Sequence, residues 1–176
     1  MQVTICTANC VGQAGNCSYP NKVTVVTPEQ LQEAVKKDHV CGEFKGNYRS
    51  IENFIRSDVI VMDIDNDHTE VPADWITAEK LEELFPNVEY LLAPSRHHLL
   101  DKEGKSARPR YHMYFPISEI TDASRYANLK KAIQSAYSFF DGNALDAARF
   151  IFGAECDEVI FHEGWMTVDE EVDISD

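Results

Sequence analysis

The sequence lacks several features that would each point to a different class of protein. No uncharged apolar run in its 176 residues approaches the roughly 20 needed to span a bilayer. The N-terminus does not have the basic-then-apolar order of a secretion signal, so we expect a cytoplasmic protein with no membrane partner. The phosphate-binding pattern Gly-x4-Gly-Lys-Ser/Thr is also missing, and with it any sequence evidence for a nucleotide-driven motor.

Basic side chains are scarce and unevenly placed. The net charge is −14, no lysine or arginine follows Arg149, and residues 155–176 carry nine acids; without that segment, 21 acids face 16 bases. An acidic surface argues against nucleic acid. Residues 96–110 nevertheless hold five of the 16 bases, and this strip fits an anionic ligand such as a nucleoside triphosphate or a strand end, or else is a solvated loop. Its members are Arg96, Lys102, Lys105, Arg108 and Arg110.

The paired C-x2-C knuckles of strong zinc signatures are absent as well. Four of the five cysteines lie in the first quarter of the chain, and four thiolates are a sufficient ligand set for a structural zinc ion. We favour buried free thiols over zinc, because the spacing between these cysteines is irregular. The four positions are Cys6, Cys10, Cys17 and Cys41.

Strands and helices are expected to alternate along the chain. Strand-like patterns occur at 23–26, 59–65, 89–93 and 111–116. A capping box from Thr27 to Gln30 begins one helix, and further helices are expected near 81–85 and 122–139. Residues 159–161 and 165–168 resemble a closing hairpin. The pattern predicts an α/β or α+β fold with a mixed central sheet.

Residues 59–65 form an apolar strand that ends in two carboxylates. Side chains alternate along a strand, so Asp63 and Asp65 point to the same side. Two carboxylates held together repel each other unless a cation lies between them, and Mg²⁺ or Mn²⁺ is the natural candidate. The alternative is a turn capped by aspartate, since Asn66 and Asp67 follow.

Two further groups complete a pattern typical of nucleotidyl transfer. His112 lies beside Arg110 on the strand at 111–116, and Asp141 lies in a loop that is followed by Arg149. Nucleotidyl transfer uses carboxylates to hold two metal ions, and basic or imidazole side chains to neutralise a triphosphate.

These residues together resemble the archaeo-eukaryotic primases (AEP), and more closely the primase–polymerases of phages, plasmids and integrative elements. The resemblance covers roughly residues 1–165, and the order and spacing of its motifs are more specific than any one of them. It implies an RRM-like sheet (58–168) with a small N-terminal α/β lobe (1–57), together a catalytic domain (1–168), followed by an acidic tail or linker (169–176). The matching stretches are 44–49, 61–67, 95–98, 108–116 and 145–153.

The resemblance implies a role for each matching position. Asp63, Asp65 and Asp141 would be the catalytic metal ligands, His112 would contact the incoming triphosphate, and Arg149 would face the nucleotide or the template.

Two positions leave alternatives open. The family pattern has a small residue two positions before the histidine, where this chain has Arg110, which supplies an extra phosphate contact or shifts the triphosphate. Asp146 is a rival to Asp141, although its position before Ala-Ala-Arg is more typical of a cap. Ser95 and Arg96 are assigned to the nucleotide. The template is assigned to Lys45, Arg49, His97, His98 and Arg108.

The sequence therefore predicts a DNA primase or primase–polymerase that makes or extends primers while a mobile element replicates. Its expected partners are a single-stranded DNA template, a primer, an NTP or dNTP, and a helicase supplied by another protein or region. One alternative is a non-catalytic acidic adaptor or nucleic-acid-binding module. Another is a nicking initiator that uses paired histidines and a tyrosine, although the alternation that would put two histidines on one strand face is absent.

Overall fold

Strand β5 (Phe54–Ile64) is the longest strand and an interior strand of the larger of two sheets in the computed structural model, which describes residues 1–172. It pairs along most of its length with β7 (Tyr111–Ile120), and the strand order is β4-β5-β7-β6-β9. Each of these neighbouring pairs is antiparallel. The remaining members are β4 (Glu43–Phe44), β6 (Tyr90–Pro94) and β9 (Ile160–His162).

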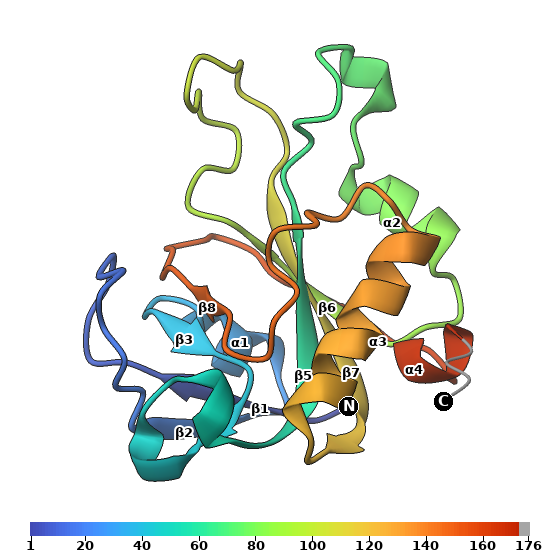
Figure 1. Ribbon diagram of the computed structural model, residues 1–176. Coiled ribbons are helices and arrows are strands. Elements are labelled where there is room, and N and C mark those ends of the chain that lie inside the picture. Colours follow the sequence, from blue (N-terminus) through green and yellow to red (C-terminus); the bar gives the residue numbers. More distant parts are fainter. Residues whose placement is uncertain (173–176) are drawn as a thin grey trace.

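The smaller sheet combines the N-terminal strands with one strand from late in the chain. Its order is β2-β1-β3-β8, again with antiparallel neighbours, and it lies beside the lower half of β5 in Figure 1. Strand β8, which follows α3 in the sequence, thus completes a sheet begun by the first 40 residues. The members are β1 (Val3–Thr7), β2 (Asn21–Val25), β3 (His39–Val40) and β8 (Phe150–Ile151).

The helices begin at polar caps that the sequence supplies. Thr27 caps the first with the expected capping box to Gln30, Thr77 caps the second, and Asp122 caps the third, whose long apolar face packs across β5 and β7 (Figure 1). The α-helices are α1 (Pro28–Ala34), α2 (Ala78–Leu84), α3 (Ala123–Ala136) and α4 (Val168–Glu171), and short 3₁₀ turns occur at Lys45–Asn47, Ile51–Asn53 and Pro72–Asp74. None of the helices in residues 1–172 is long and apolar enough to cross a membrane.

Strand β5 is buried on both faces, and this double burial positions the site. Ile60, Met62 and Ile64 belong to the core under α2 and α3, whereas Val59 and Val61 belong to the core shared with α1 and the smaller sheet. By strand alternation, the next residue on that second face is Asp63, so its carboxylate points between the two sheets.

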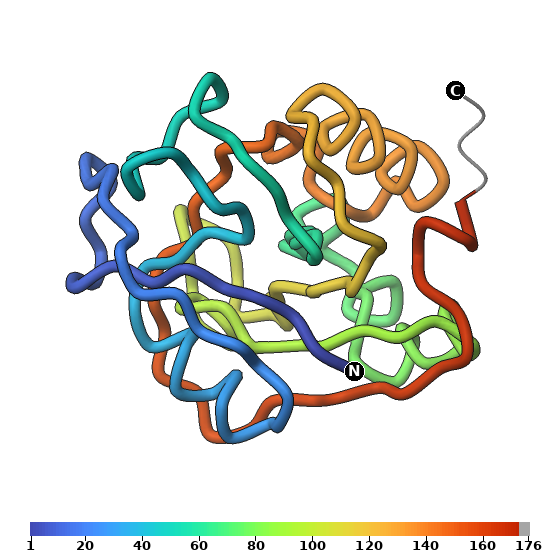
Figure 2. The backbone as a smooth tube through the Cα atoms, turned by 90° about the horizontal axis from the view of Figure 1, so that it is seen from below, coloured from blue at the N-terminus to red at the C-terminus, as the bar shows by residue number. Residues whose placement is uncertain are grey.

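The predicted α+β class is confirmed, but two details are corrected. The sheets are antiparallel, not mixed; parallel pairing in the described chain is limited to a bridge between Val88 and Met166. The expected hairpin at 159–168 is wrong. Strand β9 pairs with β6 instead, and the backbone N–H groups of Trp165 and Met166 both donate to the carbonyl oxygen of Asn87. Figure 2 follows this red segment along the outer edge of the molecule to α4.

The structure can be compared with the proposed domain boundaries in two places. Residues 168–171 form α4, so the first part of the predicted acidic tail is helical, and residues 173–176 lie outside the described residues. The division into a lobe (1–57) and a core (58–168) stays a prediction, and β8 is hydrogen-bonded to the lobe although it comes from the core segment.

Candidate active site

A cleft of about 460 Å³ lies where the end of β5, strand β8 and the loop at 95–110 meet. Both sheets contribute to it, as do side chains far apart in the sequence. Asp63 comes from β5, His112 from β7 and Phe150 from β8. The lining residues are Asp63, Asp65, Ser95, Arg96, His97, Asp101, Lys102, Glu103, His112, Arg149, Phe150, Ile151 and Phe152.

Asp63 is a buried carboxylate whose charge is compensated. Antiparallel register pairs it with His112, whose Nε2 lies 3.8 Å from Asp63 Oδ1. A terminal nitrogen of Arg149 donates to Asp63 Oδ2 at 2.9 Å. Burial raises the pKa of Asp63, but the nearby His112 and Arg149 outweigh it and hold the pKa below its ordinary value. Asp63 is therefore ionised at neutral pH.

Asp65 is in the opposite electrostatic situation. Burial, followed by the negative charge of Asp63, raises the pKa of Asp65; Lys102 opposes this, and Asp141 and Asp67 add to the increase. Two carboxylates in one cleft, one of them destabilised by the other's charge, have an energetic need for a cation. The oxygen donors fit Mg²⁺ or Mn²⁺, the metals expected for this chemistry.

Asp141 reaches the site through its backbone. Its N–H donates to the carbonyl oxygen of Asp63 at 3.0 Å, while its carboxylate accepts the N–H of Asn143 at 2.9 Å and does not line the cleft. Within residues 1–172, no group of three or more His, Cys, Asp or Glu side chains is arranged to hold a metal ion. The structure thus brings Asp63 and Asp65 together, and a third ligand role for Asp141 stays a prediction. The rival Asp146 accepts the N–H of Ala148, as expected of a capping residue.

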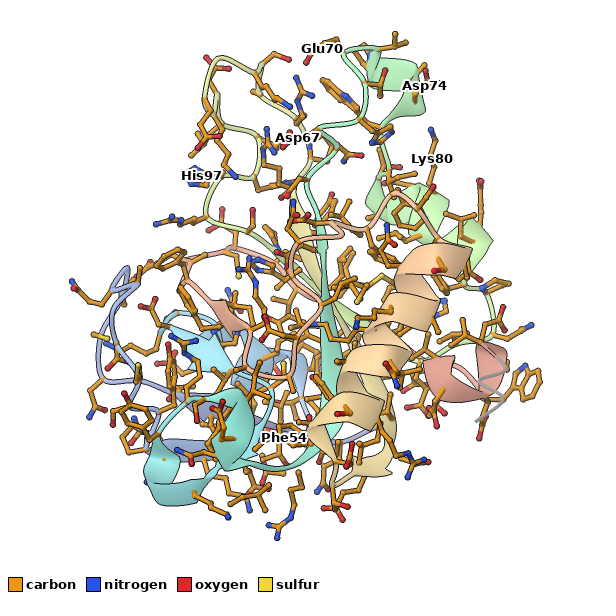
Figure 3. The ribbon with its side chains drawn as sticks, viewed as in Figure 1. Phe54, Asp67, Glu70, Asp74, Lys80 and His97 are labelled. Carbon is orange, nitrogen blue, oxygen red and sulfur yellow. The ribbon has the colours of Figure 1, made fainter. Side chains whose placement is uncertain are left out.

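Arg110 and Arg108 hold the protein together and do not face the cleft. Arg110 is 1% exposed, and its guanidinium donates to the carbonyl oxygen of Asp65 and to the carboxylate of Asp67 at 2.9 Å. Arg108 is fully buried, and its guanidinium donates to the backbone of the 66–70 segment and to Glu70 at 2.7 Å. Figure 3 shows Asp67 between the two loops that rise above the sheets, with Glu70 at the far end of one of them. The predicted phosphate contact by Arg110 and template contact by Arg108 do not fit these positions.

The neighbouring histidines diverge. His97 lines the cleft with Ser95 and Arg96, whereas His98 Nδ1 accepts the backbone N–H of Arg110 at 3.0 Å. The ring of His98 also packs on Tyr111, with 4.9 Å between ring centroids. Two histidines that face different ways do not form the paired metal ligands of a nicking initiator.

The remaining template candidates, Lys45 and Arg49, do not line the cleft. Lys45 is exposed in a 3₁₀ turn. Arg49 stacks on the ring of Phe150 and donates to the carbonyl oxygen of Ala148. Lys102, a member of the basic strip, also lines the cleft, whereas sequence reasoning gave no role to Phe150 or Phe152. The spacing Phe-Ile-Phe was the available signal for the two aromatic rings.

The cysteines do not form a zinc site. All are free thiols, and no ligand cluster that includes them occurs in the part of the chain that the structure describes. Burial raises the pKa of Cys41 to about 12 and that of Cys6 to about 11, so these two behave as small apolar side chains. Buried thiols account for Cys6 and Cys41, and the positions of the cysteines give the zinc interpretation no support.

Comparison with known proteins gives one informative result. The sequence matches no protein-family model and no curated protein. Among solved structures, the AEP domain of the primase–polymerase of cyanophage S-2L aligns with 94% of this chain and 83% of that one, at a TM-score of 0.50 and 14% sequence identity. The chain has the AEP fold. The resemblance inferred from the sequence motifs is confirmed at the level of the fold.

Proposed function

We propose that this chain is a template-directed nucleotidyltransferase of the primase–polymerase type, which adds nucleotides from an NTP or dNTP to the 3′-end of a primer. One observation carries the proposal: Asp63 and Asp65 share a cleft with three cationic side chains on an AEP fold. Nucleotidyl transfer needs carboxylates that hold metal ions, and it needs cationic side chains next to them that bind phosphates. The cations are Arg96, Lys102 and Arg149.

Asp63 and Asp65 are the residues that would hold divalent cations. When bound, such ions supply Lewis-acid stabilisation of the reacting phosphate and lower the pKa of the attacking hydroxyl. Asp65 carries a charge that Lys102 compensates only in part, and a cation would complete the compensation. Arg149 keeps Asp63 ionised and oriented, and it lies at the edge where a phosphate would meet the carboxylates.

The phosphate side of the cleft combines an imidazole with three cationic side chains. Burial lowers the pKa of His112 although Asp63 opposes this, so near pH 7 the imidazole is a weaker source of positive charge than lysine or arginine. Most of the positive charge then comes from Lys102 and Arg96 on the loop at 95–110, together with Arg149. These side chains would orient and neutralise the triphosphate.

Primer extension on single-stranded DNA with Mn²⁺ or Mg²⁺ and labelled NTPs or dNTPs tests this function. We expect extension by the unchanged protein and none by Asp63→Ala combined with Asp65→Ala. A matched control is Asp74→Asn, which changes an exposed acid away from the cleft (Figure 3) and should leave extension unchanged. Extension that survives the double substitution would show that the proposed site is wrong.

A second candidate is a non-catalytic module, and the contact between Arg149 and Asp63 favours it, because this ion pair occupies an oxygen that a metal would need. Calorimetric titration with Mn²⁺ and a nucleotide separates the two. Metal-dependent nucleotide binding supports the enzyme, whereas its absence together with failure of extension supports the module. For the enzyme, we extend the proposal to replication of a mobile element, with a helicase supplied by another protein or region; the fold shared with a phage primase–polymerase domain supports this extension.

A further inference from the structure

Two phenylalanines at the end of β8 line the cleft. Phe150 is the first residue of β8, where it also packs against the edge of the core, and Phe152 directly follows the strand. Their rings meet edge to face, with 5.0 Å between centroids. The residue between them, Ile151, is 2% exposed and packs into the core, whereas the two rings are half-buried. Core packing therefore accounts for Ile151 and in part for Phe150, but it does not account for Phe152, which belongs to neither core cluster.

Guanidinium groups from three different segments cover these rings. The Cζ atom of Arg96 lies 3.9 Å from the centroid of Phe152, and that of Arg49 lies 4.7 Å from the centroid of Phe150. Arg149 also approaches Phe150, at 6.0 Å. Together these residues form a strip in which cations and rings alternate, which we name the Arg–Phe strip.

Some hydrogen-bond donors of the Arg–Phe strip have no partner within the protein. In the described part of the chain, the Nε atoms of Arg49 and Arg149 are buried and have no hydrogen-bond partner. Arg96 is exposed, so the outer face of its stack on Phe152 is open to solvent. Unused donors beside stacked rings suit a ligand that has both negative groups and flat aromatic faces.

We propose that the Arg–Phe strip binds single-stranded nucleic acid by stacking its bases. Aromatic and guanidinium planes accept any base, because every base has a π-face, and arginines beside them meet the phosphates. Identifying the strand as the template rests on the proposed function, because the strip adjoins Asp63 and Asp65 in one cleft. Binding should then depend on the presence of bases and depend little on their order.

Equilibrium binding in the absence of metal and nucleotide tests the strip separately from catalysis. The probes are a fluorescent oligothymidylate and an abasic oligomer of the same length, which keeps the phosphates but lacks the bases. We expect the unchanged protein to bind the oligothymidylate about tenfold more tightly than the abasic strand, the size of a base-stacking contribution. Phe150→Leu combined with Phe152→Leu keeps the apolar volume but removes the rings, and it should bring the two affinities within about twofold.

Trp165→Ala is the matched control, since this aromatic side chain is 75% exposed and does not line the cleft. It should keep the full preference for the strand with bases. Equal binding of both strands by the unchanged protein would overturn the proposal, and so would an undiminished preference in the double leucine variant. If the preference depends on the rings while primer extension fails, the strip stands and the proposed catalysis falls.

Discussion

Asp38 is buried in the protein, whereas Asp65 is half-buried at the cleft, and the surroundings of the two carboxylates differ. Asp38 is fully buried, and its two oxygens accept the backbone N–H groups of Gly12, Gln13 and Gly153 at 2.8 to 2.9 Å. Burial raises the pKa of Asp38, but these three hydrogen bonds outweigh it and lower the pKa overall. Burial and then the like charge of Asp63 raise the pKa of Asp65, although Lys102 opposes them. A carboxylate whose oxygens accept backbone N–H groups, such as Asp38, joins loops. A carboxylate that lines the cleft, such as Asp65, is available to a ligand.

The arginines divide in the same way. Arg108 is buried, and its guanidinium donates to oxygens of the loops that it holds together. Arg96 and Arg149 lie at the cleft, stacked on aromatic rings. The residue type is the same in both groups of arginines. What separates them is the number of hydrogen bonds that each guanidinium makes within the chain.

The largest expected effect is on catalysis. Asp65→Asn should lower the rate of primer extension by more than about a thousandfold, because a neutral amide is a poor ligand for a divalent cation. It should leave the free energy of unfolding unchanged or raise it, since it removes charge repulsion with Asp63. Single-turnover extension and urea denaturation measure the two effects. A strongly destabilised Asp65→Asn protein would place Asp65 with the structural group.

The next effect is on packing beside Asp38. A Cβ atom at Gly153 would lie 2.3 Å from the carbonyl oxygen of Lys36, so Gly153→Ala must displace backbone. We expect a loss of about 3 kcal/mol or more in the free energy of unfolding. Gly142→Ala is the control, because its nearest neighbour would lie at 3.7 Å, an ordinary contact. Equal stability of the two variants would contradict the close approach.

Asp38→Asn should cost about 2 kcal/mol, because an amide replaces a carboxylate that accepts three hydrogen bonds. The folded fraction should keep the base preference and metal binding of the unchanged protein, since Asp38 does not line the cleft. Denaturation followed by fluorescence measures the loss. If the Asp38→Asn protein were fully stable but inactive, Asp38 would have the functional role that we assign to Asp65.

The smallest expected effect is a pH dependence of the free energy of unfolding, which comes from His39, the residue after Asp38. His39 is buried, donates from Nδ1 to the carbonyl oxygen of Lys37 and accepts at Nε2 from the hydroxyl of Tyr114. Burial lowers the pKa of His39 to about 4, so between about pH 6.5 and 4 the unfolded chain takes up a proton that the folded protein does not. Stability should therefore fall by about 1 kcal/mol from pH 7 to 5.5.

Denaturation curves at the two pH values measure this difference. His39→Gln should remove the His39 contribution, so its stability should change less over the same interval. An identical pH dependence in the variant would show that His39 is protonated in the folded protein or that other groups dominate.

The features readable from the sequence were those set by neighbouring residues. The capping box at Thr27 and the strand pattern around Asp63 depend on local spacing, and the structure has both. Arg110 was misplaced because strand alternation assigned it to the face of His112, although it precedes the first residue of β7 and turns to Asp67.

Features set by contacts between distant segments could not be read in this way. The segment after β9 is held by the carbonyl oxygen of Asn87, which no local pattern in residues 163–168 indicates. The stack of Arg96 on Phe152 joins positions more than 50 residues apart, and only the antiparallel pairing of β8 with β3 brings Phe152 to the cleft. The clustering of cysteines near the N-terminus suggested proximity, but the structure does not assemble them.

Titration with Mn²⁺, followed by the loss of the paramagnetic resonance signal of the free ion, tests the central claim most directly. The unchanged protein should bind Mn²⁺ in the presence of a nucleoside triphosphate, and Asp63→Asn combined with Asp65→Asn should abolish that binding while Asp38→Asn retains it. Equal Mn²⁺ binding by the Asp63/Asp65 variant and the unchanged protein would contradict the account.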